Sequence, residues 1–296
     1  MKYPDFVEIC EVGPRDGFQF ESKLIPPDLK VDAVKKLIEC GIPRIQITSF
    51  VHPSRVPQMA DAEEVVRAVG SGYGCILSGL ALNVRGVRRA ADSGLKFVDL
   101  SIATNEKHGF DNANMSVQEG IVHADEMISE AHDRDLSVQL NLQTVWGYQN
   151  PGDTSIEQVV KMATHFANRG LESFSLADST GMANPDSIRA VINAVREATD
   201  VPLVLHLHDT RGLAIANVVA ALEMGITRFD TSLGGLGGCP FIPGATGNVA
   251  TEDVVNLLDQ LGIKNGIKTG SVAAISREMA AFLGRSLSGK MYKLLG

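Results

Sequence analysis

The sequence lacks several features that would place it in other classes of protein. Its 296 residues contain 4 cysteines, scattered with no Cys-x-x-Cys pair, which argues against a disulfide framework and a zinc knuckle. Lys and Arg number 27 against 35 Asp and Glu, so the net charge of -8 argues against a nucleic-acid partner. No apolar run reaches the roughly 18 residues of a membrane span, and no signal-peptide core is present. We therefore expect a cytoplasmic protein that binds neither nucleic acid nor membrane.

Short β-rich runs alternate with helical stretches along the whole chain. The expected strands are 6–12, 44–50, 74–80, 97–103, 137–144, 173–177, 202–207 and 228–232. The expected helices include 28–40, 62–69, 84–93, 117–134, 155–169, 184–199 and 214–224. This rhythm predicts one α/β domain over 1–296, a (β/α)8 TIM barrel with its active site at the carboxyl ends of the strands. A doubly wound open sheet is the competing architecture.

Two histidines, His206 and His208, close the seventh expected strand and share one face, because residues i and i+2 of a strand point the same way. Asp16 follows the first strand, and Asn248 follows the eighth in a Gly-Asn pair. Strands one, seven and eight are neighbours in a closed barrel, so these groups should meet at one rim. One carboxylate, two imidazoles and one amide oxygen form a mixed shell that suits Mg²⁺ or Mn²⁺.

Such a shell leaves positions for a substrate that chelates the cation through a hydroxyl and a carbonyl or carboxylate oxygen. A metal that lowers the pKa of a tertiary hydroxyl favours cleavage of the neighbouring C–C bond. Arg15, beside Asp16, is suited to stabilise an enolate oxygen. Cys239, in a glycine-rich loop, is a candidate acid that protonates the enolate carbon.

Each of these features also has a structural interpretation. A lone His-x-His pair on a strand is more often incidental than metal-binding, and adjacent Arg15 and Asp16 could form a surface ion pair. Cys239 could be an inert small residue, and the glycines around it could form a phosphate-binding loop. Gly247-Asn248 also occurs in ordinary turns.

Several motifs resemble the 3-hydroxy-3-methylglutaryl-CoA lyase family, in order over nearly the whole chain. They are E-V-G-P-R-D-G at 11–17, T-S-F-V at 48–51, V-P-Q-M at 56–59, H-L-H-D-T at 206–210, G-L-G-G-C-P at 235–240 and G-N-V-A-T-E-D at 247–253. The resemblance implies that Asp16, His206, His208 and Asn248 bind the divalent cation. It also implies that Arg15 stabilises the enolate.

Further roles follow from the same resemblance. Cys239 would lie on the catalytic loop, and Asp178, after the sixth strand, falls where the family has a functional acid. Apart from the resemblance, His206 is a catalytic candidate as one of three groups, with Asp16 and a bound hydroxide, that could take the hydroxyl proton. The implied reaction is a retro-Claisen cleavage of a 3-hydroxyacyl-CoA to acetyl-CoA and a 3-oxo acid, acetoacetate for the methylglutaryl substrate. The resemblance further implies a homo-oligomer, either a dimer or a tetramer.

The residues expected to face the acyl-CoA substrate are Gln46, Phe20, Ser49 and Thr210. Two of them depart from the family pattern. Gln46 stands where the family usually has Glu, which removes a negative charge near Arg15 and the cation. Phe20 replaces an amide with a phenyl ring. We therefore expect an acyl substrate that is larger, more apolar or differently charged than hydroxymethylglutaryl.

Four other functions remain open at this point. A Claisen-type synthase shares the barrel, the Arg-Asp pair and the His-x-His pair, and a pyruvate-type aldolase would use a similar enolate without coenzyme A. Two histidines and a carboxylate could also hold Fe(II) for oxygen chemistry. The last alternative is a non-catalytic metal-binding or scaffold protein.

Overall fold

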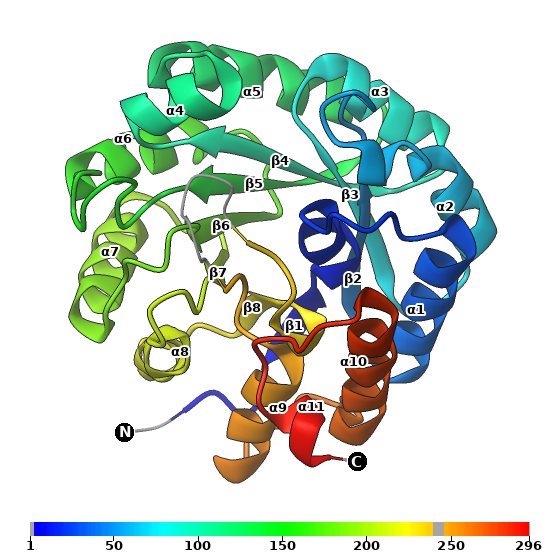
Figure 1. Ribbon diagram of the computed structural model, residues 1–296. Helices are drawn as coiled ribbons and strands as arrows, with labels where there is room; N and C mark the ends of the chain where they lie inside the picture. Colours follow the sequence, from blue (N-terminus) through cyan, green and yellow to red (C-terminus); the bar gives the residue numbers. More distant parts are fainter. Residues whose placement is uncertain (1–2, 239–245, 296) are drawn as a thin grey trace.

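The computed structural model describes residues 3–238 and 246–295, and its strands form one closed barrel (Figure 1). The eight strands that it describes follow one another around the barrel in chain order, and β8 returns to pair with β1. Every neighbouring pair is parallel. The predicted (β/α)8 TIM barrel is therefore confirmed, and the open sheet is excluded because a closed barrel has no free edge.

Each predicted strand is present, and its ends differ from the expected ones by two residues at most. The strands are β1 Glu8–Glu11, β2 Arg44–Ser49, β3 Ile76–Ala81, β4 Phe97–Ala103, β5 Ser137–Gln143, β6 Ser173–Asp178, β7 Leu203–Leu207 and β8 Arg228–Thr231. Their β-branched and aliphatic residues alternate with polar ones. That pattern suits a sheet whose apolar outer face packs on helices and whose inner face carries polar side chains.

The helices predicted from the alternating pattern are also present. They are α1 Pro27–Glu39, α2 Ala62–Val69, α3 Val84–Asp92, α5 Val117–His132, α6 Ile156–Phe166, α7 Pro185–Ala198 and α8 Ala214–Glu223. Local sequence explains several starts: Ser116 and Glu119 form a capping box at α5, and Asn184 caps α7 directly before a proline.

Four further α-helices were not among the expected ranges: the one after β8 completes the eighth strand-and-helix unit, and the other three lie outside that repeat. They are α4 Glu106–Ala113, α9 Thr251–Gln260, α10 Thr269–Leu283 and α11 Met291–Leu294. Helix α4 lies between β4 and α5, so the connection from β4 to β5 holds two helices. Helix α10 packs against α9 and α1, next to the point where the ring of helices closes (Figure 1).

The inner and outer faces of the barrel differ in chemistry. Outer-face residues such as Ile45 and Ile47 of β2 belong to the fully buried apolar core between sheet and helices. The interior is polar: Arg44 of β2 pairs with Asp99 of β4 at 2.6 Å, although these strands are not adjacent. That contact has to cross the barrel. Polar side chains thus replace the branched aliphatic layers that usually fill such barrels.

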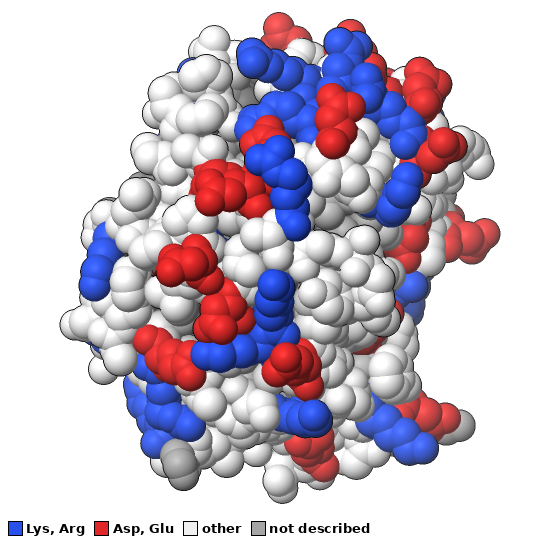
Figure 2. Space-filling view, turned by 90° about the vertical axis from the view of Figure 1, so that its right-hand side faces the viewer, with Lys and Arg blue, Asp and Glu red and all other residues white. Residues whose placement is uncertain are grey.

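Charges on the outer surface are mixed in sign. Figure 2 shows Lys and Arg interspersed with Asp and Glu on the side that carries α1 and α2. Pairs such as Lys36 with Glu278, between α1 and α10, and Arg89 with Glu63, between α3 and α2, bring opposite charges together. Within the described ranges, no helix is long and apolar enough to cross a membrane.

Glu11, the last residue of β1, joins the segments that follow the first and the last strand of the barrel. Its Oε1 accepts hydrogen bonds from the backbone N–H groups of Gly13, at 2.7 Å, and Leu233, at 2.9 Å. Its Oε2 accepts one from the hydroxyl of Thr251 at 2.6 Å. Burial raises the pKa of the Glu11 carboxyl to about 8, although these three hydrogen bonds lower it. Glu11 therefore positions the segment that follows β1 against the segment that follows β8.

This shift makes stability depend on pH. Native Glu11 keeps its proton up to about pH 8, whereas the unfolded residue loses it near 4.5. The contribution of this raised pKa to the free energy of unfolding is therefore fully present below pH 4.5. It is lost as the pH rises to about 8. We expect Glu11→Gln to flatten the decline of the free energy of unfolding across this range, measured by urea unfolding at a series of pH values. Glu278→Gln, a surface control, should keep the parent slope; a parent slope in Glu11→Gln would contradict the prediction.

Candidate metal centre

Three predicted ligands, Asp16, His206 and His208, meet at the carboxyl end of the barrel. His206 lies in β7, His208 follows directly after it, and Asp16 lies in a single π-helical turn, Gly13–Gly17, after β1. Single π-helical turns are frequent at functional sites. All three side chains are buried. Among the described residues they form a group whose ligand atoms lie within 4.8 Å of one another.

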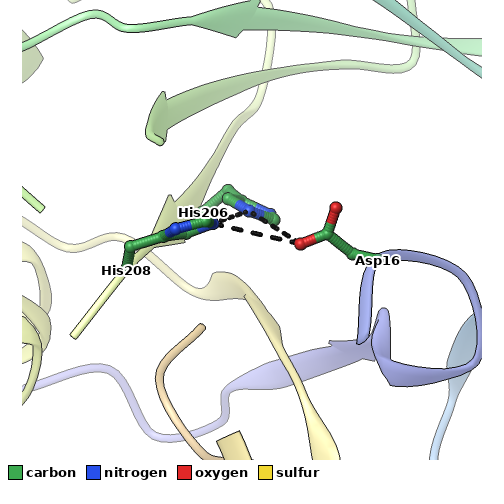
Figure 3. Close-up of side chains that lie close together, drawn as sticks. All are labelled: Asp16, His206 and His208. Atoms are coloured by element: carbon green, nitrogen blue, oxygen red, sulfur yellow. Dashed lines mark hydrogen bonds and ion pairs between the residues drawn. The ribbon is translucent and has the colours of Figure 1, made fainter. Parts of the chain in front are cut away.

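The geometry of these atoms fits a divalent cation (Figure 3). The Nε2 atoms of His206 and His208 are 3.2 Å apart, and Oδ2 of Asp16 lies 3.9 Å from each. Neighbouring ligands of an octahedral ion, each about 2.1 Å from it, are roughly 3.0 Å apart. Without a cation, one of these two nitrogen atoms can donate a hydrogen bond to the other, whereas a cation between them would accept a lone pair from each. The three residues could therefore hold a metal ion between them.

Electrostatics keep these groups in the protonation states that a cation needs. Burial raises the pKa of the Asp16 carboxyl, but Arg15 and the two imidazoles outweigh it and hold the pKa below its usual value. Burial lowers the pKa of His208 to about 3, assisted by His206. Asp16 is therefore ionised and His208 neutral near pH 7, and both present lone pairs.

Asn248 reaches the site because the segment after β8 turns back along the end of β7. The backbone N–H of Val249 donates to Leu207 at 2.9 Å, and Asn248 forms a bridge with His208. Its Nδ2 donates to Oδ2 of Asp16 at 2.7 Å, and its Oδ1 is buried with no hydrogen-bond partner in the described part of the chain. An unpartnered buried oxygen beside the triad fits a fourth ligand.

A glycine permits this approach. Gly237 has φ of +127°, and a Cβ atom there would lie 2.5 Å from Nδ2 of Asn248 and 3.5 Å from Oδ2 of Asp16. Any larger residue would displace the amide of Asn248, while its contact with Asp16 would be an ordinary van der Waals one, and the positive φ also favours glycine at this position.

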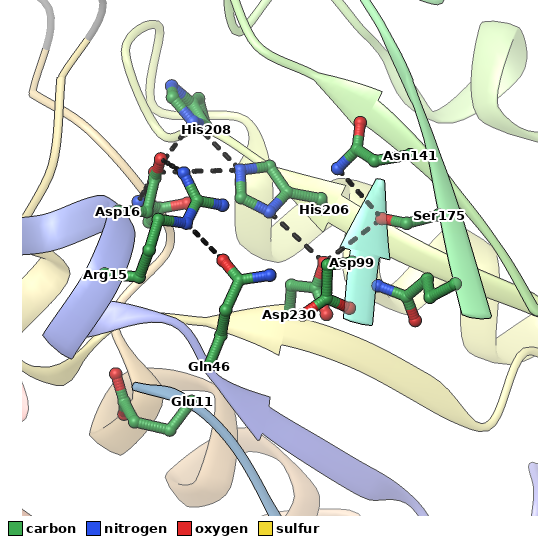
Figure 4. Close-up of polar contacts among 12 residues, drawn as sticks. Glu11, Arg15, Asp16, Gln46, Asp99, Asn141, Ser175, His206, His208 and Asp230 are labelled. Carbon is green, nitrogen blue, oxygen red and sulfur yellow. Dashed lines mark hydrogen bonds and ion pairs between the residues drawn. The ribbon is translucent and has the colours of Figure 1, made fainter. Parts of the chain in front are cut away.

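Arg15 is held beside the triad by two side chains. Its guanidinium donates from Nε to Oε1 of Gln46 and from Nη1 to Oδ1 of Asp16 (Figure 4). All three residues are buried. Gln46 thus fixes the plane of the guanidinium without adding a negative charge, and Asp16 is the carboxylate that pairs with Arg15 among the described residues.

Asp178 lies apart from this cluster. Its carboxylate accepts hydrogen bonds from the backbone N–H groups of Met182, at 2.8 Å, and Ala183, at 3.0 Å, in its own loop. Burial raises the pKa of Asp178 to about 6. Asp178 contacts the triad through the backbone, because the N–H of His208 donates to the carbonyl oxygen of Asp178. Its role as a catalytic acid stays a prediction.

Of the other predicted substrate residues, Ser49 ends β2 and Thr210 comes two residues after His208. The hydroxyl oxygen atoms of Ser49 and Thr210 are buried and have no hydrogen-bond partner among the residues placed by the structure. Phe20 is 39% exposed and lies just beyond the turn that carries Asp16. A Cβ built on Gly238 would lie 4.0 Å from Cγ of Phe20. Cys239 lies outside the described residues.

Two residues that contact the candidate site or support its loops were not identified from the sequence. Asp230, in β8, lies 3.3 Å from Nδ1 of His206, and Glu11 organises the turn that carries Asp16. Asp230 could have been suggested by identifying which positions of β8 point into the barrel, as His206 does in β7. A charged residue at an inward position is rare inside a sheet. The partners of Glu11 come from the far end of the chain, and no local pattern predicts them.

Comparison with known proteins gives a consistent result. The sequence matches the HMGL-like family over residues 6–279. It is 37% identical over 291 residues to the hydroxymethylglutaryl-CoA lyase YngG of Bacillus subtilis, covering 98% of this chain and 97% of that protein.

Solved structures of lyases superpose on the whole chain. The HMG-CoA lyase of Bacillus subtilis aligns with a TM-score of 0.96 at 36% identity, covering 99% of each chain. An HMG-CoA lyase of Acinetobacter baumannii, solved in complex with coenzyme A and 3-methylmalate, aligns with a TM-score of 0.92 at 34% identity. That alignment covers 99% of this chain and 96% of the other.

The triad predicts a measurable affinity for a divalent cation. Asp16→Asn and His208→Ala should each weaken Mn²⁺ binding by at least about 100-fold, because losing a ligand costs more than losing a ligand's hydrogen-bond partner. Isothermal titration of the metal-free protein measures this. His165→Ala, which removes a histidine paired with Asp125 at the surface, serves as the control. Parent affinity in both triad variants would rule out this site.

Proposed function

The chain belongs to the HMGL-like family of lyases, and we propose that it is a divalent-metal-dependent enzyme that cleaves 3-hydroxy-3-methylglutaryl-CoA or a related 3-hydroxyacyl-CoA. The products would be acetyl-CoA and a 3-oxo acid, acetoacetate for the methylglutaryl substrate. The observation that carries the proposal is the buried triad of Asp16, His206 and His208 with the Arg15 guanidinium beside it. A metal site next to a fixed cation suits a substrate that develops negative charge on an oxygen atom.

The donor set indicates the kind of cation. Asp16 supplies oxygen, the two histidines supply nitrogen, and Asn248 has a free amide oxygen, so the shell is rich in hard ligands. Such a shell favours Mg²⁺ or Mn²⁺ over a structural zinc ion. When bound, the cation would lower the pKa of the substrate's 3-hydroxyl group and polarise its thioester carbonyl.

The proposed reaction is a retro-Claisen cleavage. A base, for which Asp16, His206 and a bound hydroxide are the candidates, takes the proton of the 3-hydroxyl group, a carbonyl forms at C3, and the bond between C2 and C3 breaks. Its electron pair passes to the thioester as an enolate, and C2 then takes up a proton to give acetyl-CoA. Arg15 would stabilise the enolate oxygen, since Gln46 and Asp16 already hold its guanidinium in place.

Cys239 and Asp178 are the proposed acids for proton transfer. Cys239, which lies beyond the described range, would deliver the proton to C2. For Asp178 the support is its raised pKa of about 6, which suits a group that exchanges protons near neutrality. The side chains proposed to contact the substrate are Gln46, Phe20, Ser49 and Thr210.

Gln46 and Phe20 support a substrate that differs from hydroxymethylglutaryl. Gln46 leaves the charge of Arg15 balanced by Asp16 alone among the side chains that contact its guanidinium in the described structure. A site that is more positive favours an acyl group with extra negative charge. Phe20 offers a half-exposed ring at the same rim, which suits a larger or more apolar acyl chain.

Product analysis tests the reaction. Metal-loaded protein with 3-hydroxy-3-methylglutaryl-CoA and a panel of larger 3-hydroxyacyl-CoA thioesters should release acetyl-CoA and the matching 3-oxo acid, detected by mass spectrometry. Arg15→Met should lower kcat by about 10²- to 10³-fold, because it removes the enolate's cationic partner. Arg67→Met, on the exposed face of α2, should leave turnover unchanged. Release of pyruvate from a 4-hydroxy-2-oxo acid, with no thioester cleaved, would favour the aldolase instead.

A charge change at Gln46 tests the choice of substrate. Gln46→Glu should shift the ratio of kcat/KM between 3-hydroxy-3-methylglutaryl-CoA and the preferred panel thioester by about 10-fold or more, since it adds a buried charge beside Arg15. Gln118→Glu makes the same change on the exposed face of α5 and should leave the ratio unaltered. Equal turnover of the methylglutaryl substrate by parent and Gln46→Glu would refute this role.

A further inference from the structure

We propose that Asp230 is a positioning residue that fixes the tautomer and ring orientation of His206, so that the two histidines bind the metal unequally. The inference rests on the proposed metal site. His206 and Asp230 face each other in register across β7 and β8. Because side chains at paired positions share a face, both point into the barrel interior. Asp230 is 3% exposed, and its Oδ2 lies 3.3 Å from Nδ1 of His206 (Figure 4).

The contact determines which ring nitrogen carries the proton. An ionised carboxylate can only accept, so Nδ1 of His206 is the donor and Nε2 keeps its lone pair. That Nε2 atom faces Nε2 of His208 at 3.2 Å and Oδ2 of Asp16 at 3.9 Å. A distance of 3.3 Å is at the long end for a hydrogen bond, and hydrogen bonds of an active site are often long before its ligand is bound. A carboxylate behind a metal-binding histidine commonly orients it.

Other interior side chains hold Asp230 in place. The hydroxyl of Ser175, in β6, donates to Oδ2 of Asp230 at 3.1 Å, and Nδ2 of Asn141, in β5, donates to that hydroxyl at 3.4 Å. The buried Arg44 guanidinium supplies positive charge, and Asp230 is among the groups that raise its pKa. Asp230 is thus anchored on one side and faces His206 on the other.

His208 lacks such a partner. Its Nδ1 is buried and has no hydrogen-bond partner among the described residues. Its tautomer is therefore not set by a carboxylate. Removing the Asp230 carboxylate should act on metal binding through His206 alone, and this asymmetry distinguishes positioning from a general loss of negative charge.

The competing explanation is that Asp230 only balances the charge of Arg44. Asp99 provides the matched control, because it is equally buried, pairs directly with Arg44 at 2.6 Å and has no described contact with His206. If charge balance alone matters, Asp99→Asn and Asp230→Asn should have similar effects on the metal site.

The experiment uses the full chain and two readouts. Mn²⁺ affinity is measured by electron paramagnetic resonance of free Mn²⁺, and histidine tautomers are measured by long-range ¹H–¹⁵N correlation on the metal-free protein. Asp230→Asn should weaken Mn²⁺ binding by about 10- to 100-fold and reduce the Nδ1–H tautomer of His206 while leaving His208 unchanged. Ser175→Ala, which keeps the carboxylate, should move both readouts in the same direction by a smaller factor. Asp99→Asn should move neither.

The following results would count against the proposal or distinguish it from the proposed function. Parent affinity and a parent tautomer in Asp230→Asn would overturn the proposal, and so would equal weakening in Asp99→Asn. If Asp230→Asn does not fold, an unchanged tautomer and affinity in Ser175→Ala would count against it. A parent protein that binds Mn²⁺ but cleaves no thioester would refute the proposed function and leave this test intact. If the parent protein does not bind Mn²⁺, the proposal that the two histidines bind the metal unequally is overturned. The tautomer of His206 would then still test its contact with Asp230.

Discussion

Pairing of β1 with β8 brings the first and last strands of the sheet side by side, and the site depends on that closure. It places Asp16, which follows β1, beside His206 and His208, which end β7. Glu11 strengthens the junction by accepting hydrogen bonds from both ends of the chain. Without closure the ligands would sit on opposite edges of an open sheet, and no cation could bridge them.

Charge compensation is the second requirement, because the site is buried. Arg15 offsets Asp16 above the strands, while Arg44 offsets Asp99 and Asp230 inside the barrel. Buried charges are tolerated only when they are paired or bind a metal. The polar interior therefore extends from the base of the barrel to the candidate metal centre. In the proposed enzyme, this interior would orient the groups that the rim presents to the substrate.

Membership of the HMGL-like family and the site geometry support the same class of chemistry from independent directions. The family relationship covers nearly all of the chain, whereas the geometry concerns a few side chains. Gln46 is the residue at which the family relationship and the site geometry are most directly connected. It holds Arg15 as a carboxylate would, yet carries no charge, so the same scaffold presents a different electrostatic environment to the acyl group.

The sequence by itself determined the architecture and three residues of the candidate metal site. Strand and helix periodicity is local, so the eight strands and the alternating helices were predictable, and the position of His206, His208 and Asp16 at strand ends then followed from the barrel. Only the tertiary structure decided which side chains support these groups. Asp230 behind His206, Gln46 on Arg15 and Glu11 at the junction depend on contacts between distant residues. Strand register and side-chain direction set such contacts, and a linear pattern does not encode them.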